Sequence, residues 1–267
     1  MIIVRVFGVM VQAGFKRLTA YPGAVIAGIV ANTVFGLVRA AIMTAAIGGA
    51  GAAIGGYNVA QAATYVWLTQ ALLTAVNIWS WSELALRVRT GDVAVDLLRP
   101  VMLQWTMYAQ SLGASAFQLL FRGTPMILIG LVTTGMVFSR DAWSYPLAGL
   151  SIVLSMSVSF ALHWLINLIA FWVMEIRGFQ MTYMTVAQLL SGFILPISWF
   201  PEWLQTLCWL TPFPALMQTP INVLMGQSEP GLMLAQVAGQ VLWLGGLWLA
   251  GALLFFRGQQ RVVIQGG

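Results

Sequence analysis

Long apolar stretches with very few charged side chains dominate this sequence and limit what it can fold into. The stretch 59–81, for example, contains no Asp, Glu, Lys or Arg. Only 7% of all residues are charged, whereas about 25% are charged in a typical soluble domain. With 60% hydrophobic residues, the chain cannot form a surface that faces water everywhere. We therefore predict an all-α polytopic membrane protein whose outer surface contacts lipid.

Six apolar stretches of a single transmembrane domain, 1–267, are predicted to cross the membrane as helices. They are 24–47, 59–81, 124–138, 143–174, 179–197 and 232–256. The fourth is longer than the roughly 20 residues that a bilayer needs, so we expect it to tilt or to extend into the cytoplasm.

A further apolar run, 101–121, precedes the third predicted span. Polar side chains recur along it and just beyond it at the spacing of one helical face: Gln104, Ser111, Ser115, Gln118 and Arg122. This periodicity is typical of an amphipathic helix rather than of a helix surrounded by lipid. We interpret the run as a lead-in to the third span.

Two other segments are predicted to lie at the membrane surface. In 1–22, apolar side chains fall on one side of a helix, which favours an interfacial position; they are Ile3, Phe7, Met10, Val11, Phe15 and Leu18. The segment 199–225 is apolar but contains Pro201, Pro212, Pro214 and Pro220. Because proline at this density breaks a helix, we expect short re-entrant helices in the outer leaflet.

The positions of the basic residues test this topology. With six spans and both termini in the cytoplasm, ten of the 12 Lys and Arg residues lie on the cytoplasmic side, while Arg140 is outside and Arg39 is within the membrane. If 101–121 were a seventh span, seven would be inside and four outside. The positive-inside rule favours the first arrangement. A basic stripe of the kind that binds nucleic acid is absent, so no nucleic-acid partner is expected.

Several kinds of catalytic and cofactor site are missing from the sequence. The only lysine, Lys16, is not preceded by the glycines of a P-loop, so no ATP site is expected in this chain. The only histidine, His163, has no H-E-x-x-H partner, and the only cysteine, Cys208, cannot belong to a cysteine cluster. We therefore predict no metal, no resident cofactor and no stand-alone enzyme.

Polar residues within the predicted spans have two open interpretations each. Arg39 either extends to the outer headgroups or lines a path or a subunit contact, because a charge in hydrocarbon is costly. Gln70, Asn77, His163, Asn167 and Gln188 either form hydrogen bonds between helices or line a cavity. Small residues of the first span, in a row that Asn32 completes, pack either within the chain or against another subunit; they are Ala24, Gly28, Gly36 and Ala40.

Two stretches resemble the permease subunits of type-2 ABC exporters, and most closely the six-span group that includes bacterial viologen- and drug-exporter permeases. One is "TGDVAVDLLRPV" at 90–101, which is similar to the loop between spans two and three. The other is "LLSGFILPISWFPEWLQTLCWLTPFPALMQTPINVLMG" at 189–226, which resembles the proline-marked outer segment. The order of the elements also fits over nearly the whole chain.

The resemblance implies a protein of the bacterial plasma membrane that pairs with a second permease, identical or paralogous, and with separate ATPase subunits that bind ATP. It implies that 83–100 holds a cytoplasmic coupling helix and that 175–177 is a second contact with the ATPase. The residues in these contacts would be Glu83, Arg87, Gly91, Asp92, Asp96, Leu98, Arg99, Glu175 and Arg177. It assigns no role to Arg39.

The residues themselves leave other functions open. Asp92 and Asp96 lie four positions apart, which fits a solvated ion-pair network or, alternatively, acid–base catalysis. All seven acidic residues lie outside the predicted spans. A proton-coupled transporter usually needs carboxylates within the membrane to carry protons, so this mechanism is disfavoured. We therefore expect an ATP-driven exporter of a hydrophobic or amphipathic substrate. A non-transporting anchor or sensor subunit and an ion-coupled secondary transporter are the alternatives.

Overall fold

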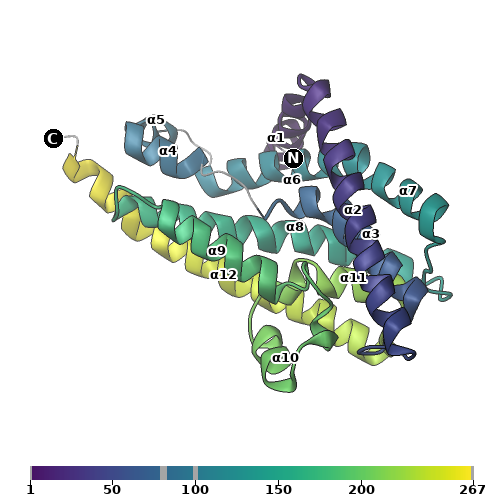
Figure 1. Cartoon of the computed structure of the whole chain (residues 1–267). Coiled ribbons are helices and arrows are strands. Elements are labelled where there is room, and N and C mark those ends of the chain that lie inside the picture. The colour runs from purple at the N-terminus through teal and green to yellow at the C-terminus, as the bar shows by residue number, and fades with distance from the viewer. Residues whose placement is uncertain (1, 79–82, 99–101, 266–267) are drawn as a thin grey trace.

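A computed structural model describes residues 2–78, 83–98 and 102–265 of the chain, and the regular elements within these ranges are helices (Figure 1). The longer helices are α1 (Ile2–Thr19), α2 (Pro22–Ala50), α3 (Val59–Val76), α6 (Leu103–Gln118), α7 (Thr124–Thr134), α8 (Ser144–Leu168), α9 (Arg177–Leu190) and α12 (Pro230–Gln265). The shorter ones are α4 (Glu83–Thr90), α5 (Val93–Leu97), η1 (Leu119–Gly123), η2 (Ile169–Phe171), η3 (Ile197–Trp199), α10 (Glu202–Trp209), η4 (Phe213–Ala215) and α11 (Gln218–Met225).

Five helical stretches of the described chain are long and apolar enough to cross a membrane. They are Pro22–Ala50, Val59–Val76, Leu103–Thr134, Ser144–Phe171 and Pro230–Arg261. The remaining predicted span, 179–197, corresponds to α9, which has 14 residues and ends at Leu190. At 1.5 Å per residue such a helix is about 21 Å long, shorter than the roughly 30 Å hydrocarbon core. The number of six spans therefore stays a prediction.

Several helix boundaries differ from those predicted. The 101–121 run and the third span form one continuous path, because α6 passes into α7 through the π-helical turn η1. α7 ends at Thr134 rather than at 138, because Gly135 adopts a left-handed conformation with φ of 63°. α2 extends beyond the predicted span 24–47 at both ends, and α12 likewise exceeds 232–256 at both ends. The 199–225 segment consists of short helices, as predicted.

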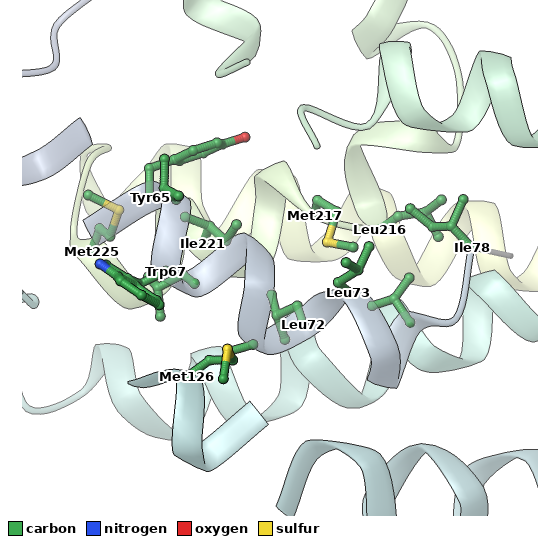
Figure 2. Close-up of a cluster of buried hydrophobic side chains, with 14 of the residues drawn as sticks. Tyr65, Trp67, Leu72, Leu73, Ile78, Met126, Leu216, Met217, Ile221 and Met225 are labelled. Carbon is green, nitrogen blue, oxygen red and sulfur yellow. The ribbon is translucent and has the colours of Figure 1, made fainter. Parts of the chain in front are cut away.

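Helix α3 occupies the centre of the bundle. In its apolar window 78% of the residues are buried, against 17% in the windows of α2 and α12. Figure 2 shows Met126 of α7 on one side of α3, and Met217 and Ile221 of the 191–226 connection on the other. Lipid is as apolar as these side chains, so they are held together by close van der Waals packing rather than by the hydrophobic effect.

Glycines allow α2 and α7 to approach α3 closely around Trp67, which is fully buried. A Cβ on Gly36 of α2 would lie 2.9 Å from Trp67 Cζ3, and a Cβ on Gly130 of α7 would lie 2.5 Å from Trp67 Cγ. Asn32 and Ala40, in the row of Gly36 on α2, are also buried within the chain. At Asn32, Gly36 and Ala40 the structure therefore supports packing within the chain, rather than packing against another subunit.

Helix α1 packs along α6 through the apolar face that the sequence predicted. Gly14 and Gly113 lie at the contact, where a Cβ on Gly113 would overlap the carbonyl oxygen of Val11. Phe15 meets Phe117 edge to face, with ring centroids 5.3 Å apart. The apolar side of α1 is thus covered by protein along this contact.

The α1–α6 contact predicts opposite effects for one substitution at two positions. Gly113→Ala is expected to destabilise the protein by about 1–3 kcal/mol, because the new methyl group has no space. Gly149→Ala on α8 meets open space and is expected to be neutral or to stabilise the helix by up to about 1 kcal/mol. Thermal unfolding in detergent measures both, and equal melting temperatures would contradict the contact.

Candidate functional site

A chain of ion pairs connects α1, α4 and α5. Arg87 donates to Asp96 Oδ2 at 2.6 Å and to Glu83 Oε1 at 3.3 Å. Glu83 in turn accepts from Arg17 of α1 at 3.2 Å. The hydrogen bond with Asp96 raises the pKa of Arg87 above its ordinary value. The sequence suggested a solvated ion-pair network of Asp92 and Asp96. Asp96 takes part in the network described here but is buried within it.

The α4–α5 segment (residues 83–98) is fixed to the end of α8. The backbone N–H of Ala85 donates to Asn167 Oδ1 at 3.2 Å. Leu84 and Val93 are fully buried in a cluster with Trp164, Leu168, Phe171 and Phe255 of α8, η2 and α12. Because these contacts join α4 and α5 to two long helices, the segment moves only together with the bundle or by breaking them.

The two segments that the resemblance implies as ATPase contacts lie together in the fold. Arg89 of α4 pairs with Glu175 at 3.6 Å, and Glu175 also pairs with Arg177 at 3.7 Å. Ile176 is buried against Ala85 and Ala170. The sequence reasoning did not select Arg89, although its position among the charges of 83–100 was a usable signal.

The α4–α5 segment also has exposed apolar side chains. Leu86 is 61% exposed, Val95 is 60% exposed and Leu98 is 86% exposed. Gly91 forms the turn between the helices with φ of 82°, and the exposed Asp92 accepts a hydrogen bond from Thr90 at 2.7 Å. Arg99 lies outside the described residues. Apolar side chains exposed beside charged ones are typical of a surface that contacts another protein.

A polar cavity of about 200 Å³ lies between α1, α3, α4, α6 and α8. The polar face predicted for the 101–121 run contributes Ser111, Ser115 and Gln118 to its wall. Three of the residues predicted to line a path or an interface also reach it: Asn77, His163 and Asn167. The tertiary structure thus brings together polar residues of α6, α8 and the end of α3, and Arg17 of α1 and Glu83 of α4 lie at the same cavity.

Hydrogen bonds occupy part of this wall: two lie within α8, and one joins α8 to Ile78, which follows α3. His163 Nδ1 lies 2.8 Å from the carbonyl oxygen of Ser159, and Nε2 lies 3.3 Å from that of Ile78. Asn167 donates to the carbonyl oxygen of His163 at 2.7 Å. Both ring nitrogens of His163 therefore have backbone partners while the ring faces the cavity.

Three other polar residues predicted for this site lie elsewhere. Asn32 and Gln70 are buried, and among the described residues Asn32 Nδ2 and Gln70 Oε1 have no hydrogen-bond partner. Gln188 donates to the carbonyl oxygen of Met184 at 3.2 Å, within its own helix. None of the three is among the residues that line the polar cavity.

Arg39 contacts the segment that connects α9 to α12, which we call the connecting segment (residues 191–226). Its Nη2 donates to the carbonyl oxygens of Phe193 and of Ile194, the latter at 2.8 Å. Its guanidinium carbon also lies 4.7 Å from the centroid of the Phe193 ring. Beside it, the Tyr65 hydroxyl lies within hydrogen-bond distance of the Gly192 carbonyl oxygen and of Gln218 Oε1. The sequence reasoning missed Tyr65 and Gln218, whose spacing along the chain gives no sign of this contact.

A family model described as "ABC-2 family transporter protein" matches residues 11–266. This range includes the α4–α5 segment, the residues of the polar cavity and the connecting segment. A comparison with curated proteins finds no match.

The ion pairs of α4 predict unequal effects for one substitution in the same helix. Arg87→Met removes the partner of a buried carboxylate and is expected to cost about 1.5–3 kcal/mol, the range for hydrogen bonds to charged groups. Arg89→Met removes an exposed pair with Glu175 and is expected to cost at most about 1 kcal/mol. Amide hydrogen exchange of residues 93–97 should accelerate about tenfold or more in Arg87→Met. Equal rates in the two variants would contradict the buried pair.

The polar cavity predicts that water reaches the side of α6 that faces it. In a Cys208→Ala background, Ser111→Cys should react with a charged methanethiosulfonate, because reaction requires a thiolate and therefore water. Leu128→Cys replaces a side chain that is 56% exposed within the predicted span 124–138, where lipid suppresses ionisation. A labelling rate for Ser111→Cys no higher than for Leu128→Cys would show a dry cavity.

Proposed function

The chain belongs to the ABC-2 family of transporter proteins, and from this premise we propose that it is the permease subunit of an ATP-driven exporter. The transported substrate would be hydrophobic or amphipathic and would leave the cell. ATP would be bound and hydrolysed by separate ATPase subunits. This chain would supply the membrane-spanning path and the surface on which an ATPase subunit docks.

The observation that carries the proposal is the combination of rigid attachment and exposure in the α4–α5 segment. Leu98, Val95 and Leu86 are exposed, while Leu84 and Val93 on the same two helices are buried against the bundle. A partner that binds the exposed side chains would gain a direct mechanical connection to α8 and α12. Docking of this kind buries apolar anchors within a polar rim, and the rim here is formed by Asp92, Glu175 and Arg177.

Closure of two ATPase subunits on ATP would displace the α4–α5 segment. Asn167 and the cluster around Trp164 would transmit the displacement to α8. The Arg17–Glu83 pair would transmit it to α1. Because packed helices switch between discrete arrangements rather than deform continuously, the bundle would alternate between an inward-open and an outward-open state.

A pathway for a large substrate requires a second permease, identical or paralogous. The low burial of α2 and α12 within the chain supports this, because each offers a long apolar face to lipid or to another subunit. In this assembly α9 and the turn after it would form the fifth of six spans, both termini would be cytoplasmic, and the connecting segment would be re-entrant in the outer leaflet of a bacterial plasma membrane. The polar cavity would accommodate water or the polar part of an amphipathic substrate.

Co-purification in detergent tests the docking surface. Leu98→Asp is expected to reduce the amount of a co-expressed ATPase subunit that co-purifies by about tenfold or more, because a buried apolar anchor contributes about 2 kcal/mol or more to an interface. Leu210→Asp is the matched control, since Leu210 is 70% exposed but lies in the connecting segment. Undiminished binding by the Leu98 variant would contradict the proposed surface.

Transport into inside-out vesicles, with ethidium as an apolar cation, separates the proposed function from its alternatives. ATP-dependent uptake that Leu98→Asp abolishes is the expected result. Binding of the ATPase without ATP-dependent flux of any tested amphiphile would indicate an anchor or sensor subunit. Uptake that continues without ATP and stops when the proton gradient collapses would indicate a secondary transporter.

A further inference from the structure

We propose that Arg39 is a positioning residue that tethers the connecting segment to α2 and thereby keeps the start of that segment packed on the bundle. The inference rests on contacts within this chain and does not depend on the direction of transport or on an ATPase. It assigns to Arg39 a role inside the subunit, in place of an extension to the headgroups.

The first support is the way in which Arg39 and the turn after α9 satisfy one another. The turn presents the carbonyl oxygens of Phe193 and Ile194, and Arg39 Nη2 donates to both. In hydrocarbon an unpaired carbonyl costs several kcal/mol, and so does a guanidinium without partners. Nη1 of Arg39 is buried without a hydrogen-bond partner among the described residues. The two bonds through Nη2 therefore satisfy both carbonyl oxygens and offset part of the cost of burying the guanidinium.

The second support is that no carboxylate competes for Arg39 in the described part of the chain. The ion pairs found there involve Arg17, Arg87, Arg89 and Arg177. Arg39 is instead partnered by backbone oxygens and by the face of the Phe193 ring, 4.7 Å from the guanidinium carbon. A planar guanidinium can make both kinds of contact at once, whereas a lysine ammonium cannot.

The third support is that the tether lies at the point where the connecting segment begins. Immediately before Phe193, the Gly192 carbonyl oxygen contacts the Tyr65 hydroxyl of α3. Further along, Ser198 donates to the Gly55 carbonyl oxygen at 2.7 Å, and the Ile197 N–H donates to Gln218 Oε1 at 2.9 Å. Arg39 thus adds a contact from the exposed helix α2 to those made by α3, by the loop before it and within the connecting segment itself.

The chain contains a natural reporter of this packing. Cys208 of α10 is the only cysteine and is fully buried against Leu190, at the end of α9, and Ile197, at η3. The turn that Arg39 holds connects exactly these two residues. If the turn is released, α9 and η3 separate and the thiol becomes accessible.

The experiment is the rate of Cys208 alkylation by N-ethylmaleimide, which permeates membranes, in vesicles that contain the full chain without nucleotide. Arg39→Met is expected to raise the rate about tenfold or more, a ratio equivalent to about 1.4 kcal/mol. Arg39→Lys is expected to give an intermediate rate. The lysine ammonium retains the positive charge, but it lacks the planar guanidinium that stacks on the Phe193 ring while it donates to the carbonyl oxygens. Arg140→Met, at an exposed position before α8, is the control and should leave the rate unchanged.

A second reporter separates a tether from general stabilisation. In the Cys208→Ala background, Ser111→Cys reports the distant polar cavity, and its alkylation should not respond to Arg39→Met. An unchanged Cys208 rate in Arg39→Met would overturn the proposal, and so would an equal rise at both reporters, since that would reflect loosening of the whole bundle. Because these rates need neither ATPase nor substrate, they can fail or succeed independently of the transport function.

Discussion

The structure depends on how closely helices can approach α3 in an environment that provides no hydrophobic driving force between them. Lipid solvates apolar side chains as well as protein does, so stability comes from van der Waals contact and from polar groups that find partners. Gly36 and Gly130 make that contact possible on two sides of Trp67. A third side of α3 is occupied by Met217 and Ile221 of the connecting segment (Figure 2).

The two regions with a functional interpretation are attached to opposite ends of this centre. Near the end of α3, the Val76 carbonyl oxygen accepts a hydrogen bond from Ser159 of α8. The C-terminal end of α8 in turn contacts the α4–α5 segment. Near the start of α3, Tyr65 contacts Gly192 and Gln218 of the connecting segment. The two regions are thus joined by packed contacts through α3 and α8, whose apolar windows are 78% and 67% buried. The exposed helices α2 and α12 are free to contact lipid or another subunit.

Polar side chains within the bundle form hydrogen bonds with backbone carbonyl oxygens. His163 and Asn167 use backbone partners for the atoms that point into protein, and they line the cavity with the rest of the side chain. Arg39 uses two carbonyl oxygens and an aromatic ring. In each case the side chain offsets part of the cost of its own burial by bonding to backbone carbonyl oxygens. These residues therefore hold particular segments in place, and Arg39 and Asn167 do so at opposite ends of the molecule.

The sequence by itself determined the membrane class, the all-helical fold and the polar face of α6, because each of these is written in composition or in local periodicity. The resemblance of 90–101 and 189–226 pointed to the family. The sequence also identified 83–100 as a charged stretch. Only the tertiary structure decided that Arg89 joins this unit to Glu175, that Asn77 and His163 share a cavity with α6, and that Arg39 contacts Phe193. These pairs are far apart along the chain, and helical periodicity specifies which face a residue occupies but not which distant helix that face meets.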